Sequence, residues 1–75
     1  MQTEQVTLLS GMTGEHTVLE LMAFVGRSNR SKFREQVLAP LLALGMVEMT
    51  IPDKPNSSKQ RYRLTAVGRA LKAEG

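Results

Sequence analysis

The fold is decided by one stretch of the sequence, TVLELMAFVGRSNR at residues 17–30. Thr17 and Glu20 form a capping box, in which each side chain accepts a hydrogen bond from the other residue's backbone N–H, so a helix is predicted to begin at residue 18. Gly26 predicts the end of that helix, because glycine adopts the left-handed conformation without strain. Ser28 or Asn29 would cap a second helix. Two helices joined by so short a turn are typical of a helix-turn-helix.

The second helix is predicted to extend from residue 29 to residue 44, with Gly45 just after its end. At about 100° per residue, four apolar residues form a stripe about 80° wide that we expect to face the core: Phe33, Val37, Leu41 and Leu44. Leu38 and Leu42 widen this stripe. Pro40 removes one backbone hydrogen bond, so we expect either a bend there or a helix that ends and restarts.

The remaining segments complete a recognisable order of elements. Residues 46–51 and 61–64 alternate apolar and polar side chains, as half-buried strands do, and the Pro, Asn and Ser between them favour an exposed loop. Helices are also predicted over residues 3–12 and, after the cap Thr65, over residues 66–73. The order predicts a winged helix-turn-helix, mainly α with a small β-hairpin (α+β): a three-helix core, a two-stranded wing and a short C-terminal helix. We expect a single domain over residues 1–75, with the helix-turn-helix at about 18–44 and the wing at about 46–65.

Charge is distributed unevenly along the chain. Residues 1–26 carry three acids and no Lys or Arg, a net −3, whereas residues 27–75 carry all ten basic residues and four acids, a net +6. A basic region of this kind suits a polyanion such as duplex DNA, although most basic side chains in proteins are simply solvated.

Candidate DNA-binding residues fall into two groups. In a helix-turn-helix the second helix presents its N-terminal half to the major groove, where side-chain amides can pair with adenine and cations with guanine or phosphate. That half and the turn before it carry Arg27, Ser28, Asn29, Arg30, Lys32 and Gln36. The wing supplies cations that suit phosphate or minor-groove contact: Lys54, Lys59, Arg61 and Arg63.

Both groups also have a purely structural interpretation. Arg30 and Arg34 lie near the edge of the apolar stripe, where their stems could cover it while their heads pair with acids such as Glu20 or Glu35. Cations on the wing could protect an exposed strand edge from pairing with other chains. Arg63 could pair across the hairpin with Glu48.

A protein-interaction module, either a homodimer or a dock for the rest of a longer chain, is the alternative to DNA binding. The second helix carries more apolar surface than one core contact needs, notably at Leu38 and Leu42. Ala39 and Ala43, on its outward face, would let another helix approach closely.

The residue types in the sequence give little support for catalytic activity. The chain has one histidine (His16), no cysteine and no glycine loop of the phosphate-binding kinds, and its acids are scattered. We therefore expect no enzymatic activity, no cofactor and no metal. Without cysteine, signal-peptide pattern or membrane-length apolar run, the protein is expected to be cytoplasmic and to make no membrane contact.

Three segments together resemble a known module: GRSNRSKFR at residues 26–34, Pro40-Leu41-Leu42 with Gly45, and IPDKPNSSKQRYRLT at residues 51–65. Over about residues 17–68 the chain resembles the C-terminal winged-helix module of bacterial RecG-like ATP-dependent DNA helicase-related proteins and of proteins described as transcriptional regulators. A closely similar module ends some Fic-family proteins. The resemblance implies a winged-helix domain of a larger protein, with DNA binding inferred from the fold. The parent activities do not carry over, because the chain has neither a Walker phosphate loop nor the His-Pro-Phe signature of Fic transferases.

Overall fold

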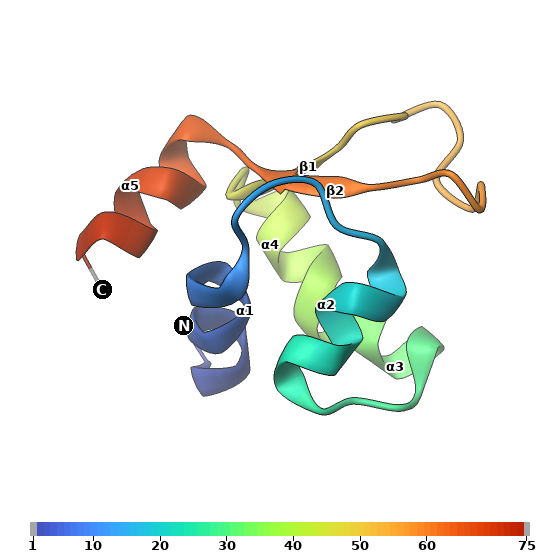
Figure 1. Ribbon diagram of the computed structural model, residues 1–75, viewed down its shortest axis with the longest axis horizontal. Helices are drawn as coiled ribbons and strands as arrows, with labels where there is room; N and C mark the ends of the chain where they lie inside the picture. Colours follow the sequence, from blue (N-terminus) through green and yellow to red (C-terminus); the bar gives the residue numbers. More distant parts are fainter. Residues whose placement is uncertain (1, 75) are drawn as a thin grey trace.

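A computed structural model describes residues 2–74 of the chain (Figure 1). The elements follow the predicted order, and the α+β winged-helix prediction is confirmed. They are α1 (Thr3–Gly11), α2 (Val18–Val25), α3 (Arg30–Phe33), η1 (Arg34–Leu38), α4 (Ala39–Ala43), β1 (Val47–Met49), β2 (Tyr62–Leu64) and α5 (Ala66–Glu74). Figure 1 shows α1, α2 and the continuous run of α3, η1 and α4 beneath the hairpin, with α5 at one end of the molecule and the loop between the strands at the other.

The start and the end of α2 are formed as the sequence predicts. The Glu20 N–H donates to Thr17 Oγ1 at 3.2 Å, and the Thr17 N–H donates to Glu20 Oε1 at 2.8 Å. Gly26 has a φ of 69°, in the left-handed region, and the Arg27 N–H then donates to the Met22 carbonyl at 3.0 Å. This Schellman ending turns the chain sharply, so that only three residues separate Gly26 from α3.

The second helix differs from the prediction in its middle. Residues 34–38 form a π turn, η1, in which the Ala39 N–H donates to the Arg34 carbonyl, and α4 resumes before Pro40. Pro40 therefore lies in the first turn of α4, where a missing N–H costs little. The irregularity of the helix that we expected at Pro40 therefore lies before Pro40, in η1.

The π turn also corrects the predicted stripe. It contains one more residue than an α turn, so the residues after it are rotated back by about 100°. Leu38 is consequently buried at 1% exposure, whereas Leu44 is 59% exposed. The prediction that Leu44 faces the core was wrong, and so was the prediction that Leu38 supplies surplus apolar surface.

The wing is a short antiparallel hairpin with a third segment beside it. β1 and β2 pair in the register Val47↔Leu64 and Met49↔Tyr62, and both strands are shorter than predicted. His16, just before α2, pairs with Tyr62 through two backbone hydrogen bonds of 2.9 and 2.8 Å. Because β2 is hydrogen-bonded on both sides, the wing is held against the helices.

Buried apolar side chains from α1, α2, the second helix and both strands form one core. Phe33, Leu8, Met12 and Leu21 are among its fully buried members, and α5 packs against α1 and β2. Gln2 is the N-cap of helix α1. The complete core cluster is Leu8, Leu9, Met12, Val18, Leu21, Met22, Phe33, Val37, Leu38, Leu41, Val47, Tyr62 and Leu64.

Candidate nucleic-acid interface

A groove separates the start of the second helix from the loop of the wing. Its volume is about 300 Å³. One wall carries Arg30 and Arg34, which are four residues apart and so share a helix face, and the other wall carries the loop residues Asn56, Ser57 and Ser58. Figure 1 places α3 and this loop on the same side of the molecule. The helix and the wing therefore face a common hollow.

Arg34 connects the two walls of the groove. Its Nη1 donates to Asn56 Oδ1 at 2.9 Å, which ties the loop to the helix. Its Nε is buried and, within the described residues, has no hydrogen-bond partner. A buried unpaired donor is unusual in a folded protein, and it leaves Arg34 with capacity for an acceptor.

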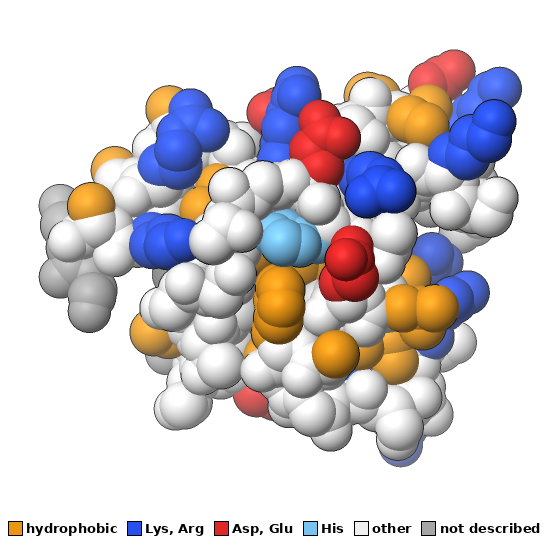
Figure 2. Space-filling view, in the orientation of Figure 1, with side chains coloured by type: hydrophobic (Ala, Val, Ile, Leu, Met, Phe, Trp, Pro, Cys, Tyr) orange, Lys and Arg blue, Asp and Glu red, His pale blue; other side chains and the backbone are white. Residues whose placement is uncertain are grey.

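Most cations around the groove are free of carboxylates. Among the described side chains, ion pairs within 4.0 Å involve only Arg27 and Arg63. In Figure 2 Lys and Arg side chains gather along the right-hand edge, over the loop of the wing and over α3, and a second group lies over α5 on the left. On the second helix and the wing, the cations without a carboxylate partner among the described side chains are Arg30, Lys32, Arg34, Lys54, Lys59 and Arg61, and all except the half-buried Arg34 are exposed.

Arg27 is engaged inside the molecule. Its Nε and Nη2 donate to the two Glu4 carboxylate oxygens at 2.5 and 2.6 Å, and its Nη1 donates to Gln36 Oε1 at 3.1 Å. The hydrogen bonds from Arg27, more than its charge, hold the pKa of the Glu4 carboxyl below its usual value, and the same pairing raises the pKa of Arg27. Two of the predicted DNA-binding side chains, Arg27 and Gln36, are thus bound to each other and to α1.

Arg63 is also engaged, and in the way predicted. It faces Glu48 across the hairpin, with Nε donating to Oε1 at 2.9 Å, and its Nη1 lies 3.8 Å from Glu15 Oε2. Arg61, two residues earlier on the same outward face, contributes to lowering the pKa of Glu20, although the capping hydrogen bond from the Thr17 backbone is the larger cause.

Asn29 caps the second helix. Its Oδ1 accepts from the Lys32 N–H at 3.0 Å, which confirms it as the cap and leaves its amide NH₂ as the part able to meet a base. Ser28 beside it is exposed. Of the predicted residues of the second helix and its turn, Arg27 is engaged inside the molecule, and Gln36 is exposed but binds Arg27 through its Oε1. The others are exposed: Ser28, Asn29, Arg30 and Lys32.

Comparison with known proteins places the chain in a family. Residues 4–65 match the family described as Filamentation induced by cAMP protein Fic-like, C-terminal domain. The chain belongs to this family. A crystal structure of a Fic family protein from Desulfovibrio desulfuricans G20 is 36% identical to it with a TM-score of 0.78, and the match covers 88% of this chain and 21% of that chain. No protein among the curated sequences matches.

Membership of the Fic-like C-terminal family confirms one part of the resemblance noted in the sequence. The similarity to the module that ends Fic-family proteins is borne out, whereas the similarity to RecG-like helicase-related proteins finds no support. The Fic-like domain described by this chain spans about a fifth of the length of the Fic family protein that it matches.

One residue important to the wing of this Fic-like domain was not singled out from the sequence. Gln60 is 4% exposed, and its side chain binds the loop backbone at both ends of the amide. Its Oε1 accepts from the Ile51 N–H at 3.0 Å, and its Nε2 donates to the carbonyls of Ile51 and Lys54 at 2.5 and 2.9 Å. The sequence shows only a glutamine beside a predicted strand, and this does not distinguish a buried side chain that binds the loop backbone from a surface residue.

Over residues 2–74, no three His, Cys, Asp or Glu side chains lie close enough together to hold a metal ion. No helix in the described part of the chain is long and apolar enough to cross a membrane.

Proposed function

We propose that this Fic-like C-terminal domain binds duplex DNA through the groove between the second helix and the wing. The observation that supports the proposal is a set of six cations on the second helix and the wing that have no carboxylate partner among the described side chains, two of which, Arg30 and Arg34, line the groove. The six are Arg30, Lys32, Arg34, Lys54, Lys59 and Arg61. The exposed Ser28 and Asn29 at the start of the second helix are the side chains proposed to reach base edges.

Residues whose side chains are already bonded within the domain have a different role in this proposal. Arg27 is a positioning residue that holds the helix-turn-helix against α1, because its guanidinium donates to Glu4 and to Gln36. Gln36 is exposed and only its Oε1 is engaged, so its amide NH₂ stays available to DNA in this proposal. Arg63, bound to Glu48, is proposed to contribute less than Arg61 to phosphate contact.

The expected strength of binding follows from counterion release. A protein that contacts six phosphates has a slope of log affinity against log salt near −5. Much of the affinity is then independent of sequence, and the loss of one phosphate contact flattens the slope by about one.

Fluorescence anisotropy with a labelled random-sequence duplex, measured over a series of salt concentrations, tests the proposal. Lys59→Gln is expected to weaken all duplexes alike and to flatten the slope, whereas Arg63→Gln should change it by clearly less. Unchanged anisotropy at tens of micromolar protein and low salt would rule out duplex binding.

Protein interaction is retained as a second function because of a specific apolar surface. Leu44, rotated outward by the π turn, and Val67 near the start of α5 are 59% and 54% exposed. Thr65 Oγ1, two residues before Val67, donates to the Gly45 carbonyl, next to Leu44, so the two side chains lie on neighbouring segments. Light scattering would detect self-association, and Leu44→Ser would abolish it if this surface forms the contact.

The domain is further proposed to act as part of a larger protein and to have no catalytic activity itself. The match covers 21% of the relative of known structure, so most of that protein lies outside the matched region, and the activity of such a protein is proposed to reside there. For the larger protein to be a RecG-like helicase-related or transcription-regulatory protein, this chain would have to be joined to a helicase-related or regulatory region.

A further inference from the structure

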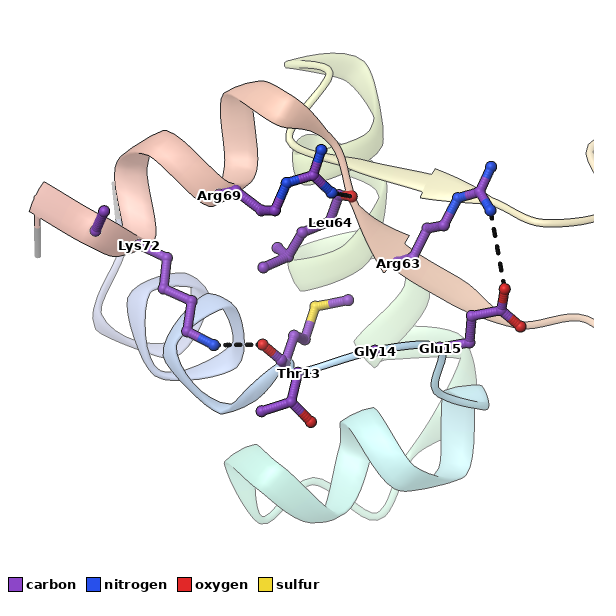
Figure 3. Close-up of a pocket in the computed structure, with 9 residues that line it drawn as sticks. Thr13, Gly14, Glu15, Arg63, Leu64, Arg69 and Lys72 are labelled. Atoms are coloured by element: carbon purple, nitrogen blue, oxygen red, sulfur yellow. Dashed lines mark hydrogen bonds and ion pairs between the residues drawn. The ribbon is translucent and has the colours of Figure 1, made fainter.

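A second hollow lies at the opposite end of the molecule from the DNA-binding groove. It is bounded by α5, by the link between α1 and α2, and by β2, and its volume is about 640 Å³. Figure 3 shows the side chains of Arg63, Leu64, Arg69 and Lys72 around it. A hollow of this size is in the range that binds small molecules.

The floor of this hollow is apolar. Leu64, which is 8% exposed, and the exposed Ala73 of α5 line it, while Met12 lies beneath them and is fully buried. Apolar surface that remains open to water favours a ligand with a hydrocarbon part.

The α5 wall is cationic. Arg69 Nη1 donates to the Leu64 carbonyl at 3.1 Å, and Lys72 Nζ donates to the Met12 carbonyl at 2.5 Å (Figure 3). Neither has a carboxylate within ion-pair distance among the described side chains, whereas Arg63, on the opposite wall, pairs with Glu15 and Glu48. Each backbone carbonyl uses one donor, so a guanidinium with five N–H groups and an ammonium with three still have donors for an anion.

We infer that this hollow is a binding site for a small amphiphilic carboxylate, an aliphatic acid whose tail lies along Leu64 and Ala73 and whose carboxylate is bound by Arg69 and Lys72. Charge complementarity decides the head group, because these two cations have no carboxylate partner among the described side chains and Glu15 is already bound to Arg63. A carboxylate can accept two parallel hydrogen bonds from Arg. The site shares no side chain with the proposed DNA-binding groove.

Titration of the ¹⁵N-labelled chain with octanoate, followed by NMR, tests the inference directly. Saturable shifts are expected at the backbone amides of Thr13, Gly14, Leu64 and Ala73, with millimolar affinity for a ligand of this size. Acetate, which lacks the tail, and octylamine, which carries the opposite charge, should leave these amides unshifted at the same concentration. Equal binding of octanoate and octylamine, or no saturable shift from octanoate, would overturn the inference.

Two variants test whether octanoate is bound by the cations of the α5 wall or attracted by the overall positive charge of the domain. Arg69→Gln and Lys72→Gln each remove a charged donor and should weaken octanoate about tenfold, because a charge-assisted hydrogen bond is lost. Lys54→Gln on the wing is the matched control and should leave the affinity unchanged. Octanoate affinity that falls equally in all three variants would indicate nonspecific charge attraction and contradict a built site.

Discussion

At the scale of single residues, the contact between Glu4 and Arg27 joins α1 to the turn of the helix-turn-helix. The two residues are 23 positions apart in the sequence, and the pair forms two charge-assisted hydrogen bonds. Arg27 then reaches Gln36 one element further on. A candidate base-reading residue is thereby fixed by an acid in the first helix.

The Glu4 pair predicts a specific pH dependence of stability. Because the folded-state pKa of Glu4 lies below the ordinary value of 4.5, its contribution is present above that value and is lost as the pH falls through the folded-state pKa. The melting temperature of the wild type should therefore exceed that of Glu4→Gln at pH 7, with the gap closing below about pH 4.5. A gap that stays constant between pH 7 and pH 3 would show that the ion pair does not contribute in this way.

Gln60 makes the strongest residue-scale prediction for the wing. Gln60→Ala removes three hydrogen bonds to the loop backbone and leaves the Ile51 N–H without a partner, while the Ile51 and Lys54 carbonyls still accept from backbone N–H groups. It should lower the free energy of unfolding by about 1–2 kcal/mol in urea titrations. Gln36→Ala is the matched control, since it removes a single exposed contact with Arg27 and should cost less than about 0.5 kcal/mol. Equal losses in the two variants would contradict a special role for Gln60.

At the scale of the elements, the sequence predicts what local interactions determine. Thr17, Glu20 and Gly26 define both ends of α2 by contacts within a few residues of one another, and alternation in Tyr62-Arg63-Leu64 defines the inward face of β2. The π turn could not be predicted in this way. Its position depends on how Phe33 and Leu38 both reach the core, which is a property of the packed molecule.

The same limit applies to the site. Residue type and position predicted that basic side chains border the second helix and the wing, and that Arg63 pairs with Glu48. They did not predict that Arg27 binds Glu4 or that Arg34 reaches Asn56, because both partners are more than 20 residues away. Long-range pairing depends on tertiary structure, which determines which cations remain available to a ligand.

Helix α5 supplies an element-scale prediction in which two effects oppose each other. Gly68→Ala improves helix propensity by about 1 kcal/mol, but a Cβ at this position would overlap the Met46 carbonyl oxygen and crowd Leu64. Backbone overlap should prevail and destabilise the domain by about 2 kcal/mol or more, because α5 must shift. Gly11→Ala, whose Cβ would lie at 3.4 Å from Phe24, is the control and should be close to neutral in thermal unfolding.

At the scale of the whole molecule, where the cations lie is more informative than how many there are. The formal net charge is only +3. Helix α3 and the loop of the wing lie at one end of the molecule, and α5, which carries Arg69 and Lys72, lies at the other (Figure 1). An electrostatic interaction with DNA governed by net charge would respond equally to changes at either end, whereas an interaction through the groove would not.

Two double variants with the same net charge distinguish these possibilities. Lys54→Gln with Lys59→Gln and Arg69→Gln with Lys72→Gln each remove two positive charges and lower the formal net charge from +3 to +1. The wing variant should flatten the salt slope of duplex binding by about two, because two phosphate contacts are lost, while the α5 variant should leave it near the wild-type value. Anisotropy titrations of both variants on one duplex, at matched salt series, provide the comparison. Equal slopes in the two variants would show that DNA responds to the total charge of the molecule, and the groove between the second helix and the wing would then have no special role.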